Sequence, residues 1–106
     1  MLKRKYYHQK LIRDKIPEYV KASGDEFETR VMDNSEFEKE LKKKLIKEAK
    51  ELSHASNESL LNELADVLEL VKSICSQYKI KFHEVERYQI EKRKKRGGFN
   101  KRIFLI

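Results

Sequence analysis

The sequence contains one cysteine, one proline, three glycines and no tryptophan. A single cysteine, Cys75, excludes an intramolecular disulfide and any zinc site built on a CxxC pair. Glycine and proline interrupt helices, so their scarcity allows long ones. No apolar run approaches the roughly 20 residues needed to span a bilayer, and no apolar segment follows the basic N-terminus as in a signal peptide. We therefore expect a cytoplasmic protein that makes no membrane contact.

The length and composition favour one small helical domain covering residues 1–106. Hydrophobic residues make up 39% of the chain and charged residues 41%, a balance that suits helices with one apolar and one charged face. A chain of this size buries only a modest core, and many such proteins complete their burial by self-association. We expect a homo-oligomer, either a dimer or a tetramer.

The net charge of +7 is distributed unevenly. Residues 1–15 carry six basic side chains and one acidic one, and residues 87–106 carry eight and one. Residues 16–86 carry eleven basic and sixteen acidic side chains. Basic ends can bind nucleic acid or the phosphates of a small nucleotide. The acidic middle favours a nucleotide, because it would repel a polyanion lying across the body, so nucleic acid is the less favoured partner.

The pattern of apolar residues predicts an all-α fold, an antiparallel hairpin or bundle of three to four helices with short terminal strands. Asp33–Ser35 is a cluster of helix-capping residues, and Ser35 with Glu38 fits a capping box. Ser56 or Asn57 is expected to cap the following helix. In chain order the expected elements are a short helix from Pro17 to Ser23, a strand at 26–32, helices at 35–54, 57–78 and 82–96, and an apolar strand at 102–106. The second long helix is apolar on more than half of its circumference, which predicts a buried central position for it.

Two pairs of carboxylates are the most informative feature of the sequence. Glu48 and Glu51 are three residues apart on the first long helix, and Glu63 and Asp66 are three apart on the second. Residues at this spacing share a helical face, and a short loop between two helices makes them antiparallel neighbours. Four acids facing one another repel unless a cation lies between them, and oxygen ligands suit Mg²⁺, with Mn²⁺ as a substitute.

The positions of these acids strengthen the prediction of a metal site. Glu48 and Glu63 each lie within or beside an apolar stripe, where a solvated charge has no reason to be. Glu69, three residues beyond Asp66, extends the same acidic line as an additional ligand or as the residue that orients water. Glu-rich helical faces are nevertheless common, and a single ExxE pair has little specificity. The combination of two pairs on adjacent helices carries the hypothesis.

These motifs resemble the all-α nucleoside triphosphate pyrophosphohydrolase superfamily, the MazG-like group, whose pattern is ExxE, a gap and ExxD. Here the pattern reads Glu48-Ala-Lys-Glu51 and Glu63-Leu-Ala-Asp66. Residues 10–18 (KLIRDKIPE) and the ending with Lys92 and residues 95–99 (KRGGF) are similar to a subgroup often labelled phosphoribosyl-ATP pyrophosphohydrolase-like. The sequence departs from the family at Lys47, where a second glutamate is frequent.

The resemblance implies cleavage between the α and β phosphates of a nucleotide, dependence on magnesium, and oligomerisation. It assigns Glu48, Glu51, Glu63 and Asp66 to the metal. A pyrophosphate leaving group also needs cations, for which Lys92, Lys95 and Arg96 on the last expected helix are the candidates. Two further substrate-binding candidates on the N-terminal arm are Arg13 and Lys15. A role in clearing the nucleotide pool fits better than histidine biosynthesis by family analogy, and the base remains open.

Three other hypotheses are compatible with the sequence. A nucleic-acid-binding helical module would use the basic termini and require no metal. A non-catalytic interaction protein would pair its acids with nearby lysines, of which Lys44, Lys47 and Lys50 are close in sequence. An inactive member of the same fold is the third.

Overall fold

The computed structural model describes residues 5–6 and 9–106, and it confirms the all-α class. Two basic residues of the N-terminal end, Lys3 and Arg4, lie outside the described residues. The helices are α1 (Ile16–Ala22), α2 (Asn34–Ser53), α3 (Leu60–Gln77) and α4 (Phe82–Arg96). Within the described ranges no helix is long and apolar enough to cross a membrane.

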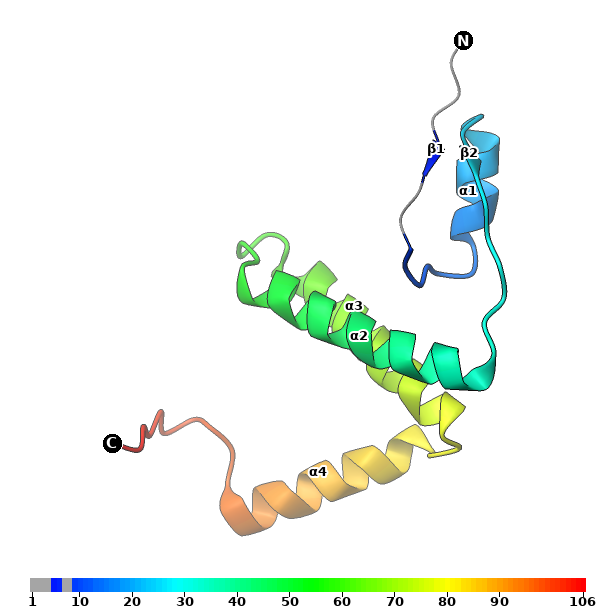
Figure 1. The fold of residues 1–106 in the computed structure, drawn as a ribbon. Coiled ribbons are helices and arrows are strands. Elements are labelled where there is room, and N and C mark those ends of the chain that lie inside the picture. The colour runs from blue at the N-terminus through cyan, green and yellow to red at the C-terminus, as the bar shows by residue number, and fades with distance from the viewer. Residues whose placement is uncertain (1–4, 7–8) are drawn as a thin grey trace.

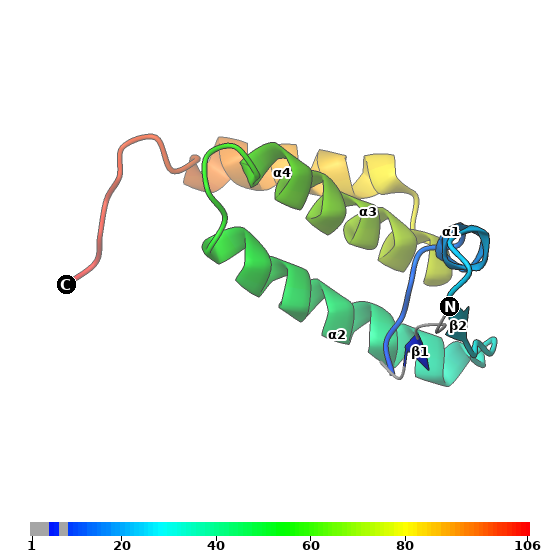
Figure 2. The ribbon, with the colours of Figure 1, turned by 90° about the horizontal axis from the view of Figure 1, so that it is seen from above.

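The antiparallel hairpin of α2 and α3 is the main packing unit (Figure 2). Residues 54–59 join the two helices, and this short connection turns α3 back along α2, as the sequence predicts. Helix α4 follows α3 after a tight turn and then diverges from the hairpin, so that its last turn lies away from α2 and α3 (Figure 1). The fold therefore places the predicted carboxylates on facing helices and the basic C-terminal end outside them.

The helix ends agree with expectation in position but differ in their caps. Asp33 is the N-cap of α2 and its side chain accepts a hydrogen bond from the N–H of Glu36 at 2.9 Å. The predicted capping box of Ser35 and Glu38 is wrong, because α2 begins at Asn34 and Ser35 is already in its first turn. The N-cap of α3 is Ser59, later than predicted, because Ser56 instead holds the preceding turn through its hydroxyl.

The hydrophobic core of the single chain is small. Among the described residues, its buried apolar side chains are Leu41, Leu70 and Cys75. Helix α3 contacts α2 and α4, but Leu61, Leu64 and Leu68 are 80%, 48% and 46% exposed. The predicted buried central position of α3 is not reached in one chain, because α2 covers only one of its faces and α4 touches it only near the turn.

The two ends of the chain contain little regular structure. Strand β1 (Lys5–Tyr6) pairs in parallel with β2 (Glu26–Phe27), so the expected strand at 26–32 shrinks to two residues. The expected strand at 102–106 is absent, and these residues are irregular and exposed. An apolar, β-prone segment needs a neighbouring strand for its backbone hydrogen bonds, and the tail extends away from β1 and β2 (Figure 1).

Candidate metal centre

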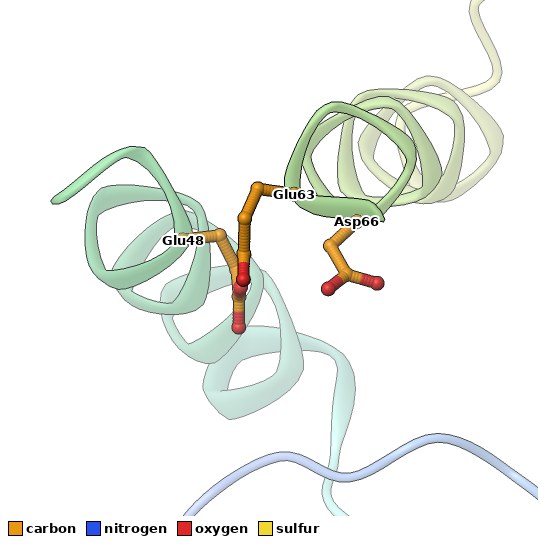
Figure 3. Close-up of side chains that lie close together, drawn as sticks. All are labelled: Glu48, Glu63 and Asp66. Atoms are coloured by element: carbon orange, nitrogen blue, oxygen red, sulfur yellow. The ribbon is translucent and has the colours of Figure 1, made fainter. Parts of the chain in front are cut away.

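Three of the predicted carboxylates meet between α2 and α3. Glu48 comes from the second half of α2, and Glu63 and Asp66 come from the first two turns of α3. One oxygen of each lies within 4.8 Å of the others. Figure 3 shows Glu48 and Glu63 pointing toward each other across the helix pair, with Asp66 beside them. The i, i+3 spacing on α3 and the antiparallel packing of the hairpin produce this cluster, which we call the carboxylate triad.

Glu48 of the triad is buried, and Glu63 and Asp66 are half-buried. Glu48 is 7% exposed, and it is the buried charged residue of the described chain. The Oε2 atoms of Glu48 and Glu63 are both buried and have no hydrogen-bond partner among the described residues. A buried carboxylate oxygen without a partner loses its hydration and gains nothing in return. These two atoms therefore point to a ligand that binds between the helices.

The electrostatic environment of Glu48 agrees with this interpretation. Burial raises the pKa of Glu48 above its ordinary value, and the neighbouring carboxyl groups of Glu51 and Asp66 raise it further. The ammonium of Lys44 opposes this shift but lies 3.9 Å away. The site thus disfavours the charged form of Glu48 in the absence of a stronger cation.

Two protein cations partly neutralise the triad from its edges. Arg13, on the N-terminal arm, donates a hydrogen bond from Nη2 to Oδ1 of Asp66 at 2.6 Å. Lys44 lies one turn before Glu48 on α2, with Nζ at 3.9 Å from its Oε1. Glu63 has no ion pair with a described residue. The negative charge at the centre of the triad is therefore less well compensated than at its rim.

The donor set fits a hard divalent cation. All three groups supply carboxylate oxygens, which magnesium and manganese prefer over the nitrogen and sulfur ligands typical of zinc. Two oxygens bound to one magnesium at about 2.1 Å are about 3.0 Å apart when cis and about 4.2 Å apart when trans, so oxygens within 4.8 Å would draw together by up to roughly 2 Å when they bind one ion. The two unpartnered oxygens would then have a partner.

The remaining two acids of the prediction lie outside the triad. Glu51 is exposed, pairs loosely with Lys47 at 4.0 Å, and is close enough to Glu48 to raise its pKa. Glu69 is exposed one turn beyond Asp66 on α3. Glu51 therefore borders the triad, whereas Glu69 shares only its helix.

The basic candidates divide into two groups. Arg13 contacts the triad directly. Lys15 is exposed at the start of α1, and Lys92, Lys95 and Arg96 are exposed on the last two turns of α4. Because α4 diverges from the hairpin, Lys92, Lys95 and Arg96 do not lie beside the carboxylates of the same chain (Figure 1).

A second group of cations was not predicted as a site. A cavity of about 320 Å³ lies between residues 9–11 of the arm and α2, and five lysines line it. We call it the lysine pocket, and its basic residues are Lys10, Lys43, Lys44, Lys47 and Lys50. The signal available in the sequence was the i, i+4, i+7 spacing of three of these lysines, which places them on one face of α2. That signal could not show that the N-terminal arm forms the opposite wall.

Comparison with models of known protein families, with curated proteins and with solved structures finds no match for this chain.

We expect Arg13→Gln to tighten the binding of Mn²⁺ severalfold, because the guanidinium competes with the metal for Asp66. Calorimetric titration of metal-free protein with MnCl₂ measures this. Arg30→Gln is the matched control, since Arg30 and Glu36 form an equally short exposed pair far along the chain from the triad. Unchanged or weaker Mn²⁺ binding by Arg13→Gln would show that the arm does not compete for the triad.

Proposed function

We propose that this chain is a magnesium-dependent nucleoside triphosphate pyrophosphohydrolase of the MazG-like type, which releases a nucleoside monophosphate and pyrophosphate. The observation that carries the proposal is the carboxylate triad with two buried, unpartnered oxygens. Its residues are three of the four that the resemblance assigns to the metal, and the fourth, Glu51, borders them. Such an enzyme would act in the cytoplasm, where nucleotides and magnesium are abundant.

The residues of the site would have different roles in the reaction. Glu48, Glu63 and Asp66 would hold the cation, and Glu51 would complete its ligands or orient the attacking water. Bound magnesium would neutralise phosphate oxygens next to the bond that breaks. We assign to Glu69 the alternative role of orienting the water from α3. Arg13, on leaving Asp66, is free to bind a phosphate oxygen, because its guanidinium presents several donors in a fixed plane.

We infer that the chain functions as a homo-oligomer. Its radius of gyration is 18.1 Å, against about 13 Å for a compact domain of this length. Its accessible surface is 10249 Å², about 4,000 Å² more than a compact monomer of 12.8 kDa exposes. Each subunit of a large obligate dimer contributes roughly 1,000–2,500 Å² to its interface. A second copy covering α3 and α4 would bury a large part of this excess, and it would also allow Lys92, Lys95 and Arg96 to reach a neighbouring triad.

A nucleic-acid-binding module is the second candidate function, and the basic residues of the last turns of α4 favour it. Arg93, Lys94, Lys95 and Arg96 form an exposed basic helix end next to the tail. This candidate leaves the buried carboxylates without a role, so we rank it below the enzyme.

The test is release of pyrophosphate from a panel of canonical and modified nucleoside triphosphates, measured with Mg²⁺ and with EDTA. We expect Mg²⁺-dependent release from at least one nucleotide, and the panel reports the base that is preferred. Glu63→Gln should abolish release, because it removes a metal ligand whose oxygen has no other partner. Absence of release from every nucleotide by folded protein, together with no affinity for Mg²⁺ or Mn²⁺, would overturn the proposal.

A further inference from the structure

The lysine pocket concentrates positive charge beside the carboxylate triad. Glu40 is the one acidic residue in its wall, against five lysines. Two of the lysines have carboxylate neighbours, Lys44 at 3.9 Å from Glu48 and Lys47 at 4.0 Å from Glu51. Both distances are at the outer limit of an ion pair, and Lys10, Lys43 and Lys50 make no ion pair with a described residue. The pocket is therefore short of negative charge.

The state of Lys44 shows this shortage most directly. Its side chain is only 20% exposed, although ammonium groups are normally solvated. Its carboxylate neighbour, on Glu48, is 3.9 Å away, and Lys47 and Lys10 line the same cavity. Lysines from two separate segments, the arm and α2, thus converge on one cavity and repel one another there. An anion bound in the cavity would relieve this repulsion.

We propose that the lysine pocket binds the phosphate chain of a polyphosphate ligand, with a nucleoside triphosphate as the substrate class. The cavity volume of about 320 Å³ is at the lower end of the range for small-molecule sites, which suits a compact chain of phosphates. Lysine ammonium groups are common point-charge partners of phosphate oxygens. The apolar side chains of Leu11 and Ile46 also line the cavity, and the methylene groups of the lysine side chains can pack against them.

The position of the pocket gives the phosphate chain a direction. Lys44 belongs to the pocket wall and also pairs with Glu48 of the triad, so the two sites are adjacent along α2. Lys44 lies one turn before Glu48 on α2, while Lys47 and Lys50 lie at nearly the same level as Glu48, so a chain that begins at the triad is within reach of all three lysines. This orientation rests on the proposed function, because it places the reacting phosphate at the triad. Binding of the phosphate chain itself requires no metal.

A nucleic-acid backbone fits this pocket less well. The arm forms one wall of the cavity, and the triad with Glu51 stands at its edge, so a long polyanion crossing the pocket would meet both. A short phosphate chain can end at the triad and bind Lys10 of the arm without having to continue past either of them. Three or more linked phosphates should therefore bind more tightly than one or two, because they reach more of the five lysines.

The test is calorimetric titration of the full chain with tripolyphosphate, pyrophosphate and phosphate in EDTA. Lys43→Gln/Lys47→Gln/Lys50→Gln removes three pocket lysines and keeps helix-compatible side chains. Lys10→Gln removes one from the opposite wall. The matched control is Lys21→Gln/Lys79→Gln/Lys81→Gln, which removes the same charge from exposed positions outside the pocket. Mn²⁺ titration and a single-stranded oligonucleotide competitor complete the set.

We expect the dissociation constant of tripolyphosphate to rise at least about tenfold in the pocket variant, equivalent to about 1.4 kcal/mol, and to stay within about twofold in the control. Lys10→Gln should weaken it in the same direction. Mn²⁺ binding should be retained in all variants, and it should tighten in the pocket variant because Lys47 no longer competes for Glu51. Equal tripolyphosphate affinity in native and pocket-variant protein overturns the inference. It is also overturned if the oligonucleotide displaces bound tripolyphosphate when the oligonucleotide is at the lower concentration of the two. If native protein does not bind Mn²⁺ or has no activity, only the proposed function is overturned. The phosphate titration contains no metal, so it tests the lysine pocket separately.

Discussion

Glu48→Gln should abolish binding of Mg²⁺ and Mn²⁺ while making the metal-free protein more stable. Glu48 is the most buried residue of the triad, and its replacement removes a charged ligand that the cation needs. We expect release of pyrophosphate to fall at least about 10³-fold, which corresponds to several kcal/mol of lost stabilisation. The same change removes a buried charge without a full partner, which should add about 1–3 kcal/mol to the free energy of unfolding.

The pH dependence of this stability gain has a definite sign. The folded protein raises the pKa of Glu48, so ionisation of Glu48 costs folding stability. The native metal-free protein should lose stability as the pH rises from the ordinary glutamate value through the raised value, and Glu48→Gln should not. Burial, Glu51 and Asp66 act in this direction and Lys44 acts against it. The difference in melting temperature between the two proteins should therefore grow with pH and then level off.

Melting curves in EDTA and in MgCl₂, with metal titrations, check these expectations. Glu38→Gln, on the same helix but away from the triad, is the control that should change neither metal binding nor pH dependence. Magnesium should raise the melting temperature of native protein and leave that of Glu48→Gln unchanged. A Glu48→Gln variant that still binds Mn²⁺ with native affinity would remove the triad from the mechanism.

The second large effect should come from the outer face of α3. Leu61→Glu/Leu64→Glu places two charges where a second copy is proposed to pack, and both side chains are exposed in the single chain. If the chain were a stable monomer, charges at exposed positions would cost little. In an oligomer they are buried without partners, so we expect dissociation and a fall in melting temperature of more than about 10 °C.

Light scattering and melting curves over a range of protein concentrations measure this effect. The native chain should have two or four times its monomer mass of 12.8 kDa, and its melting temperature should rise with concentration. Val31→Glu is the control, because Val31 is 99% exposed in the segment before α2, away from α3. A native protein of 12.8 kDa at every concentration would contradict the proposed oligomer.

The helices and the triad were predictable because they depend on short-range patterns. The apolar stripe of α2 and the short connection at 54–59 predict the hairpin. The i, i+3 spacing of Glu63 and Asp66 then predicts one face of α3, and Glu48 follows from the antiparallel packing. Each of these inferences needs only helical geometry and one loop length.

The unpredicted features depend on contacts between distant parts of the chain. The Arg13–Asp66 pair joins residues 53 positions apart, and the lysine pocket needs the arm to pass along α2. Nothing in the local pattern fixes such a path. Leu70 is buried while Leu64 and Leu68 are about half exposed, because the face that α2 covers depends on the rotation of α3 about its own axis. The divergence of α4 likewise depends on the turn after α3.

The closeness of the triad ligands along the chain has a consequence for folding kinetics. Glu48 and Glu63 are fifteen positions apart, so the loop that they close is short and its entropic cost is small. Local contacts of this kind form early, before the distant contacts of the arm. Mutual repulsion of the carboxylates opposes closure of this loop, whereas a divalent cation would join its ends. Magnesium should therefore accelerate closure of the hairpin during refolding, and the nascent chain would acquire its metal ligands well before its termini are in place.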